Sequence, residues 1–227
     1  MRVLSIDTST MMSSISIMED DKIIGDCSIN QEQTHSEKLM VLVDRLLNDL
    51  KLNLKDIDLF AVAKGPGSFT GLRIGMTSIK AIAQALDKKI IGVSTLEAMA
   101  FSILNAKNIL AIIDARGKRY FAGLYKMIDG KLELVFEDLI NEDDIIEVID
   151  ELDDITIVGD AIAKLPQEIK ELGKIKLAPA SLNNSIARNI CCLAKEKFEQ
   201  GYEDSYFDLN PNYLRKSQAE INLKKNK

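Results

Sequence analysis

Val3-Leu4-Ser5-Ile6-Asp7 is a short apolar stretch that ends in an acid, and Leu110-Ala111-Ile112-Ile113-Asp114 repeats it in residue type and order. Short apolar runs of this kind are typical of buried strands. Each stretch precedes two further β-prone segments joined by a tight turn, at 14–29 and at 120–136. The repeated order indicates an internal duplication with a half-length near 107 residues. Chance similarity between two β-meanders is the alternative.

Helical periodicity follows each meander. Asn141 is a candidate N-cap because acids follow it, and Gly201 is a candidate helix stop. The predicted helices cover 36–51, 69–86, 141–151 and 184–199, and further strands are predicted at 58–63, 155–158, 175–177 and 212–215. The halves are expected to meet near 95–108. The chain is therefore predicted to be an α/β protein with two mixed-sheet halves, 1–100 and 101–227.

The chain has 227 residues and a formal net charge of −6. An acidic surface repels phosphate at long range, so any contact with nucleic acid is expected to be indirect. The basic residues near the end are interpreted as a solvated terminus: Arg215, Lys216, Lys224, Lys225 and Lys227. No apolar run approaches the roughly 18 residues of a membrane span. We expect a cytoplasmic protein that does not bind membranes.

Three cysteines, Cys27, Cys191 and Cys192, form neither an even set nor a C-x-x-C pair. They are interpreted as small buried hydrophobic residues. His35 is the single histidine, and Leu39 stands where a second imidazole one helical turn on would be needed for a shared metal. The sequence therefore predicts no metal site and no metalloprotease. No Ser/His/Asp or Cys/His set is recognisable, so no catalytic residue is predicted.

Two turns could hold a phosphate group. Asp7-Thr8-Ser9-Thr10 ends the first strand, where hydroxyls and an acid can face a hydrated cation. Gly65-Pro66-Gly67-Ser68-Phe69-Thr70-Gly71 lies between a strand and a helix whose N-terminus attracts anions. A purely structural turn is the alternative for both. The candidate nucleotide or phosphate residues are Asp7, Thr8, Ser9, Thr10, Gly65, Gly67, Ser68, Thr70 and Asp114.

The first two helices carry more apolar surface than an ordinary surface helix, whose apolar stripe spans about 100°. Their surplus is interpreted as an interface with another subunit, and the alternative is that both helices pack as core under a sheet. The candidate interface residues are His35, Leu39, Leu42, Val43, Leu46, Leu50, Leu72, Met76, Ile79 and Ala83. Leu46→Glu is expected to abolish dimerisation without unfolding the chain.

Several motifs, in order along the chain, resemble the TsaB family, also called YeaZ, of bacterial tRNA threonylcarbamoyladenosine biosynthesis. The block from Gly65 to Gly75 is the most specific of them. The matching stretches are Arg2 to Ser9, His35 to Leu39, Gly65 to Gly75, Ile91 to Leu96, Ile113 to Arg116 and Pro211 to Arg215. The resemblance implies a duplicated actin-like, sugar-kinase-like fold.

The resemblance also implies a function. The family is paralogous to TsaD, the catalytic subunit that transfers a threonylcarbamoyl group to N6 of adenosine 37 in tRNA and carries an H-x-x-x-H metal site. In this chain the corresponding segment, His35 to Leu39, lacks the second histidine. The implied role is a non-catalytic scaffold that dimerises with a TsaD-like subunit, or with itself when alone, and that a TsaE-like ATPase joins.

The resemblance implies no required cofactor and at most weak ATP or ADP binding in the complex, and it leaves contact with tRNA indirect. An older label of glycopeptidase finds no support in the residues. The alternative function is a nucleotide-binding ATPase or kinase-like enzyme of the same superfamily, using Asp7 to Thr10, the glycine-rich turn and Asp114. Hydrolysis of ATP by the pure protein would discriminate between the two.

Overall fold

Each repeated segment forms one five-stranded mixed sheet. The computed structural model describes residues 1–30, 35–103, 105–183 and 186–214. The first sheet has the order β3-β2-β1-β4-β5, and its strands are β1 (Arg2–Asp7), β2 (Met12–Glu19), β3 (Lys22–Asn30), β4 (Leu59–Gly65) and β5 (Lys89–Ser94). The second has the order β8-β7-β6-β9-β10, and its strands are β6 (Asn108–Asp114), β7 (Arg119–Ile128), β8 (Lys131–Asn141), β9 (Ile155–Val158) and β10 (Ile175–Leu177).

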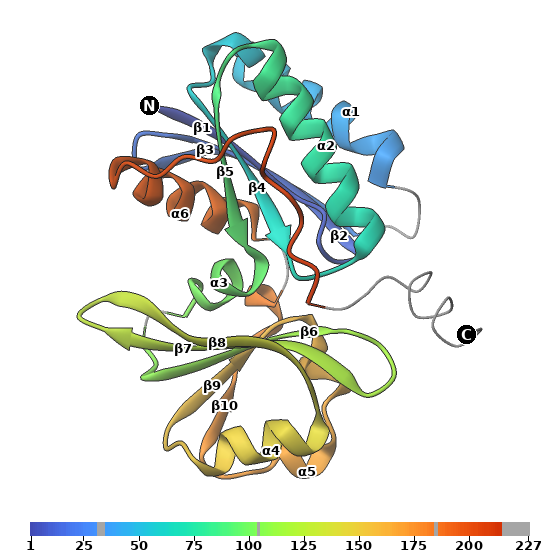
Figure 1. The fold of residues 1–227 in the computed structure, drawn as a ribbon, viewed down its shortest axis with the longest axis vertical. Helices are drawn as coiled ribbons and strands as arrows, with labels where there is room; N and C mark the ends of the chain where they lie inside the picture. The colour runs from blue at the N-terminus through green and yellow to red at the C-terminus, as the bar shows by residue number, and fades with distance from the viewer. Residues whose placement is uncertain (31–34, 104, 184–185, 215–227) are drawn as a thin grey trace.

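The two sheets have the same topology. In each, the first three strands form an antiparallel meander and the fourth pairs in parallel with the first. The fifth strand then adds in parallel beside the fourth. The predicted duplication is therefore confirmed, with β1 corresponding to β6 and both strands ending in an aspartate. Figure 1 shows the two resulting lobes one above the other.

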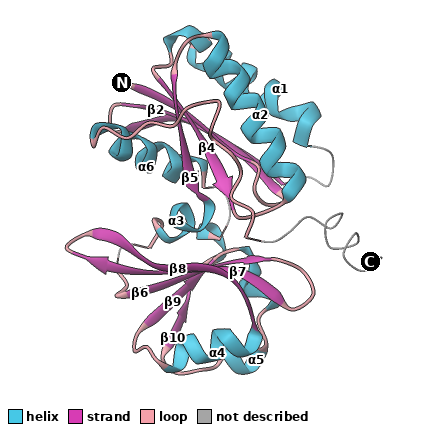
Figure 2. Ribbon diagram, in the orientation of Figure 1, coloured by secondary structure: helices cyan, strands magenta, loops and turns pink. Residues whose placement is uncertain are grey.

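The helices lie outside and between the sheets (Figure 2). They are α1 (His35–Leu50), α2 (Phe69–Ala85), α3 (Thr95–Ala100), α4 (Glu142–Asp150), α5 (Gln167–Lys170) and α6 (Ala187–Glu199), with short 3-10 turns η1 (Leu54–Asp56), η2 (Asp160–Lys164) and η3 (Ala180–Leu182). Asn141 caps α4 as predicted, because its side chain accepts from the N–H groups of Asp143 and Asp144. Among the described residues, no helix has both the length and the apolar character of a membrane span.

The central strand β1 shows how one sheet serves two cores. Side chains alternate across a strand. Leu4 and Ile6 join the cluster under α1 and α2, whereas Val3 joins the cluster that faces the second lobe. Both faces of β1 are buried, which explains why its sequence reads as a continuous apolar run rather than as an alternating one.

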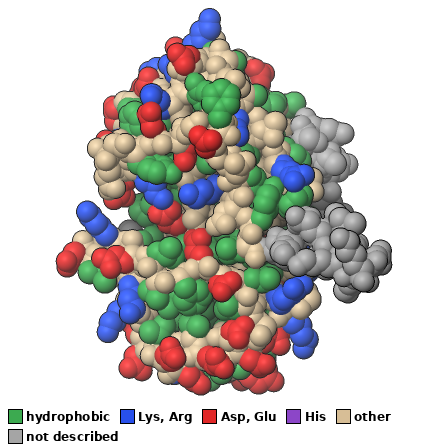
Figure 3. All heavy atoms as spheres, viewed as in Figure 1, with side chains coloured by type: hydrophobic (Ala, Val, Ile, Leu, Met, Phe, Trp, Pro, Cys, Tyr) green, Lys and Arg blue, Asp and Glu red, His purple; other side chains and the backbone are tan. Residues whose placement is uncertain are grey.

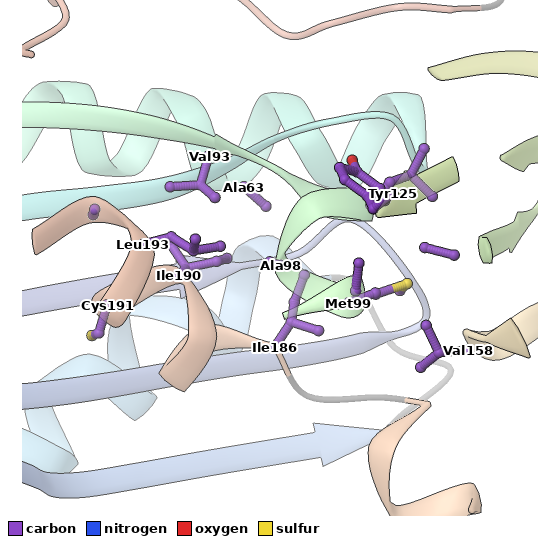
Figure 4. Packing of buried hydrophobic residues seen from close by; sticks show 14 of the residues in the cluster. Ala63, Val93, Ala98, Met99, Tyr125, Val158, Ile186, Ile190, Cys191 and Leu193 are labelled. Carbon is purple, nitrogen blue, oxygen red and sulfur yellow. The ribbon is translucent and has the colours of Figure 1, made fainter. Parts of the chain in front are cut away.

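The core between the lobes contains side chains from both sheets together with α3 and α6 (Figure 4). Val93 comes from the first sheet, Tyr125 from the second, and Ile190 from α6. Burying apolar surface shared by both halves is the main force that holds them together. One hydrogen-bonded cluster lies beside this core, in which the hydroxyls of Ser94 and Tyr125 both donate to Oε1 of Glu137.

The predicted division at residue 100 needs a correction. Helix α6 returns to the first sheet, where Ser5 Oγ donates to the carbonyl of Ala187 at 2.6 Å and the backbone N–H of Ala187 donates to Ser14 Oγ at 3.3 Å. The residues after α6 also cross the first sheet, since Asp204 forms a bridge with Ile90 of β5. The first lobe therefore includes the end of the described chain, because α6 is needed to cover the inner face of its sheet.

Other predictions shift at their edges. Helix α6 begins at Ala187 instead of at 184. Strand β5 was not among the predicted strands, and α3 occupies part of the region 95–108 that was predicted only as a boundary. No strand forms at 212–214, although Asn212 does pack back on the body by donating its N–H to the carbonyl of Lys64 at 2.6 Å. Only Cys191 is fully buried; the other two cysteines, Cys27 and Cys192, are partly exposed.

Candidate functional site

The turn after β1 is buried by its own chain. Asp7, Thr8 and Ser9 are each about 1% exposed. The Ser9 N–H donates to Asp7 Oδ1 at 2.8 Å. Burial raises the pKa of Asp7 to about 6, against the opposing effect of its hydrogen bonds from Ser9. Asp160 of the other lobe adds to this rise, so the two lobes bring acids into mutual range.

The glycine-rich turn packs against the turn after β1. The backbone N–H of Ser68 donates to the Ser9 carbonyl at 2.6 Å, and Thr8 Oγ1 donates to the Gly71 carbonyl at 2.7 Å. A Cβ on Gly67 would lie 2.3 Å from the Ser9 carbonyl oxygen, and one on Gly71 would lie 2.0 Å from that of Thr8. Gly67 and Gly71 are thus required because the backbone of Ser9 and Thr8 lies too close for a side chain. This backbone occupies the side of the glycine-rich turn that faces β1.

Ser68 is the residue that caps α2, since its Oγ accepts from the Gly71 N–H at 3.3 Å. Thr70, the other hydroxyl residue at this end of the helix, is exposed in its first turn. Two backbone N–H groups at the N-terminus of α2 therefore already have acceptors, Ser68 Oγ and the Ser9 carbonyl. A phosphate at this place would have to compete with these internal acceptors.

The second lobe contributes a cluster around Asp114, at the end of β6. Its backbone N–H donates to Asp160 Oδ1 at 3.2 Å, and its carboxylate pairs with Lys164 and accepts from the Arg116 N–H. Partial burial acts to raise the pKa of Asp114, but the hydrogen bonds from Lys164 and Arg116 outweigh it, so the pKa lies below its usual value. Burial holds the pKa of Asp160 above its usual value.

The predicted site residues therefore gather at two places that face each other. Asp7 to Thr10 and the Gly65–Gly71 turn form one side, and Asp114 forms the other. Sequence reasoning missed Asp160 and Lys164. The signal that could have found them is Gly159-Asp160 directly after β9, because Gly159 has a φ of +130° and turns the chain back towards β6. No group of three or more potential metal ligands occurs in the described part of the chain.

Two surface hollows lie away from these residues. One, of about 300 Å³, is lined by α3, α6 and the β7–β8 hairpin, with Glu97 and Lys197 forming an ion pair beside it at 2.7 Å. The other, of about 290 Å³, lies beside Lys107 and Asn108. Neither hollow is lined by any of the predicted phosphate residues.

The interface prediction needs a correction for most of its residues. Seven of the ten candidates are buried inside the chain: Leu39, Leu42, Val43, Leu72, Met76, Ile79 and Ala83. All except Leu72 belong to the core cluster between the two helices and the first sheet, and Leu72 packs against Gly65, so they offer little surface to a partner. The core alternative therefore describes them correctly.

The remaining three interface candidates differ. Leu46 and Leu50 are half-buried over β3, where a Cβ on Gly25 would lie 2.8 Å from each of them. His35 begins α1, and its side chain lies outside the described residues. The apolar residues that α1 does expose are Met40 and Val41, at 39% and 63%.

Comparison with known proteins now gives the family. A family model described as TsaD, tRNA N6-adenosine threonylcarbamoyltransferase, matches residues 22–223. The tRNA threonylcarbamoyladenosine biosynthesis protein TsaB of Bacillus subtilis is 33% identical over 225 residues, which cover 97% of this chain and 96% of that protein. This chain belongs to the TsaB family. TsaB of Escherichia coli is 36% identical over 126 residues, about half of each chain at 54%.

The solved structure of YeaZ from Pseudomonas aeruginosa agrees with the fold. It superposes with a TM-score of 0.78 over 93% of this chain and 99% of that one, at 24% sequence identity. The family membership and the duplicated two-sheet α/β fold predicted from the sequence are both confirmed.

Proposed function

We propose that this chain is a non-catalytic scaffold subunit of the machinery that forms N6-threonylcarbamoyladenosine at position 37 of tRNA, and that it binds and supports a TsaD-like catalytic subunit. The observation that carries the proposal is the match to TsaB of Bacillus subtilis, which runs over 97% of the chain. The relationship to TsaD extends to the family model that covers residues 22–223.

The geometry of the candidate site supports a non-catalytic role. Ser9 fills the glycine-rich turn on one side, and Lys164 neutralises Asp114 on the other. An active site keeps its charged groups and donors available for a substrate. Here, Ser68 and Asp114 use these groups on Ser9 and Lys164, each within its own lobe. We therefore propose that no cofactor is required and that ATP or ADP binds at most weakly.

We propose that the partner surface lies on the exposed face of α1 and α2 and not on the buried residues of these helices. Val41 and Met40 are the large apolar side chains exposed on α1, and α2 exposes the small residues Thr77, Ala81 and Ala85. Small side chains permit a close approach of helices, and apolar side chains supply the hydrophobic contribution that an interface needs. The same face would form a homodimer when the partner is absent.

Charge supports an indirect contact with tRNA. The net charge is −6, and acidic side chains gather at the end of the second lobe that carries α4 and α5 (Figure 3). Phosphate is repelled from such a surface. The tRNA would then be held by the catalytic subunit, and a TsaE-like ATPase would join that assembly in the cytoplasm. The basic residues from Arg215 onward lie outside the described residues.

The proposal is tested by reconstituting tRNA modification from purified subunits. Asp114→Ala in this chain should leave the rate of modification within about twofold of the unmodified protein, because the acid takes no part in the reaction. Val41→Asp should reduce the rate at limiting subunit concentration, because the subunits would separate. A loss of more than a hundredfold with Asp114→Ala, at full complex formation, would contradict a non-catalytic role.

A nucleotide-binding ATPase is the second candidate, and one observation favours it. Asp160 of the second lobe lies within electrostatic range of Asp7 and accepts from the Asp114 N–H, so one residue links the acids at the ends of β1 and β6. The purified chain would then hydrolyse ATP, and Asp7→Asn would abolish the hydrolysis. The scaffold proposal expects no hydrolysis above the level of a heat-treated sample.

A further inference from the structure

The chain after α6 runs back over the first lobe as an extended segment. Gly201, with a φ of +85°, follows the end of the helix and turns the chain. We call residues 202–214 the C-terminal strap. Figure 1 shows it in red, crossing from α6 over the first sheet to the level where β4 ends. It has one isolated bridge and no strand of its own.

The first contact of the strap covers the edge of the sheet. The N–H of Asp204 donates to the Ile90 carbonyl at 3.0 Å, and Asp204 Oδ2 accepts from the Gly92 N–H at 2.8 Å. Lys89 of β5 pairs with Glu203 at 2.7 Å. Asp204 thus provides the hydrogen-bond donor and acceptor that a neighbouring strand would provide to β5. It covers this open edge of the sheet.

The second contact anchors the strap in the core. Leu209 is 5% exposed and joins the cluster under α1 and α2. A Cβ on Gly92 would lie 2.6 Å from Leu209 Cδ1, so the glycine leaves the room that this side chain occupies. Lys80 of α2 donates to the Leu209 carbonyl at 2.8 Å. The strap is therefore attached to β5 and to α2 at one point.

The third contact holds the glycine-rich turn from the side opposite to Ser9. The Asn212 carbonyl oxygen lies 2.7 Å from the position of a Cβ on Gly65. The Tyr213 ring stacks on Phe69 with centroids 4.5 Å apart, and Arg73 Nε donates to the Tyr213 hydroxyl at 3.0 Å. Phe69 is the first residue of α2 and Arg73 lies one turn further on, so the strap contacts the first turn of the helix.

We propose that the C-terminal strap is a brace that fixes the glycine-rich turn and the first turn of α2. Gly65 has a φ of +104°, and glycines lose much conformational entropy when a turn is fixed. Contacts with Ser9 on one side and with Asn212 and Tyr213 on the other hold this turn in one conformation. The proposal concerns the isolated chain and does not depend on the function proposed above.

Amide hydrogen exchange of the full chain tests the brace. Tyr213→Ala removes the ring contact with Phe69 and the hydrogen bond from Arg73, so exchange across 63–72 should accelerate about tenfold. Phe207→Ala is the matched control, because Phe207 is a strap residue whose ring is 74% exposed and touches Tyr206. β9 (Ile155–Val158) in the other lobe serves as the internal reference.

The proposal requires acceleration at 63–72 with Tyr213→Ala, an unchanged reference, and no change with Phe207→Ala. It is overturned if Tyr213→Ala leaves exchange at 63–72 unchanged. It is equally overturned if the reference strand accelerates by the same factor, because the effect would then be a general loss of stability.

A second pair of variants tests whether the anchor and the turn are coupled. Gly92→Ala should displace Leu209 and accelerate exchange at 63–72 several-fold. In a chain that already carries Leu209→Ala, the nearest atom to the added methyl group is Lys64 Cδ at 3.2 Å instead of Leu209 Cδ1 at 2.6 Å, and the Lys64 side chain can move aside. Gly92→Ala should then add less further acceleration at 65–72. Additive effects of the two substitutions would show that the strap does not transmit its anchoring to the turn, and would contradict the brace.

Discussion

At the residue scale, the glycine-rich turn owes its composition to contacts inside the chain. A Cβ on Gly71 would lie 2.0 Å from the backbone oxygen of Thr8, which cannot move without shifting β1. Gly71→Ala should lower the free energy of unfolding by about 3 kcal/mol through overpacking. Urea unfolding measures this, and Gly173→Ala is the control, since a Cβ on Gly173 meets nothing within 4 Å. A tolerated Gly71→Ala would indicate an open cradle instead.

The buried carboxyl of Asp7 predicts a pH effect. Burial raises its pKa to about 6, whereas the pKa of an ordinary aspartate is 3.8. The folded state therefore binds this proton more tightly than the unfolded state, and stability contributed by the neutral carboxyl is present below about pH 4 and is lost as the pH rises through about 6. Asn cannot ionise, so Asp7→Asn removes that loss.

The measurement is urea unfolding of the Asp7→Asn and unmodified chains at pH 4.5 and 7.5. Relative to the unmodified chain, the variant should gain about 2 kcal/mol between the two pH values, since pH 4.5 lies roughly 1.5 units below the pKa of the folded state and one pKa unit corresponds to about 1.4 kcal/mol. Other titrating groups are common to both chains and cancel in the comparison. An equal difference at both pH values would show that Asp7 does not titrate in this range.

Part of the candidate site was readable at this scale, and part was not. A strand ending in Asp7 or Asp114 is visible in one sequence because the acid follows an apolar run directly. The partners Asp160 and Lys164 were missed, because Gly159-Asp160 marks a turn in the sequence but only the parallel pairing of β6 with β9 brings that turn to Asp114. The packing of Ser9 into the glycine-rich turn depends likewise on the pairing of β1 with β4.

At the element scale, one face of α1 carries apolar residues that belong to the core, and another carries apolar residues that are exposed. Leu46 packs over Gly25 of β3, so Leu46→Glu should lower the free energy of unfolding by about 1–3 kcal/mol by burying a charge. This differs from the expectation formed from the sequence, in which Leu46→Glu left the fold intact. Val41→Asp, on the exposed side, should leave the unfolding midpoint nearly unchanged. Thermal unfolding followed by circular dichroism measures both, and similar midpoints would place Leu46 at the surface.

Periodicity predicted where the helices lie but not which faces stay open. The pattern of α1 and α2 gives an apolar arc correctly, and Asn141 and Ser68 are caps that local sequence signals identify. Whether the apolar arc of a helix packs against a sheet or against a partner depends on how much of the arc the rest of the chain covers. Here the first sheet and the neighbouring helix cover nearly all of the arc, and Met40 and Val41 remain exposed.

At the scale of the whole molecule, the lobes share one core and one polar cluster. Burial raises the pKa of Tyr125, and the charge of Glu137 beside it adds to the rise, so the phenol stays protonated and donates to that carboxylate. Tyr125→Phe should lower the free energy of unfolding by about 1.5–3 kcal/mol, the range for hydrogen bonds to charged groups. Tyr202→Phe, at a residue that is 45% exposed, is the control for urea unfolding. Equal costs would show that the buried hydrogen bond from Tyr125 to Glu137 stabilises the fold no more than an exposed one.

The duplication was predictable because each half repeats a local pattern of strands and turns, which single-sequence periodicity records. The return of α6 and the C-terminal strap to the first lobe was not, because nothing local in Ala187 to Leu214 says which sheet these residues cover. Their position follows from the inner face of the first sheet, where Ser5 and Ser14 bond to Ala187. Contacts between residues so distant in sequence leave no periodic signal.

The central claim is that this chain works by binding a catalytic partner through the exposed face of α1 and α2. Light scattering of the chain mixed with its TsaD-like subunit tests it most directly. We expect a homodimer alone that converts to a complex with the partner. The complex should be lost with Val41→Asp, at a residue that is 63% exposed, but not with Leu134→Asp, at an apolar residue of β8 that is 59% exposed. A strict monomer that ignores the partner, or a complex unaffected by Val41→Asp, would contradict it.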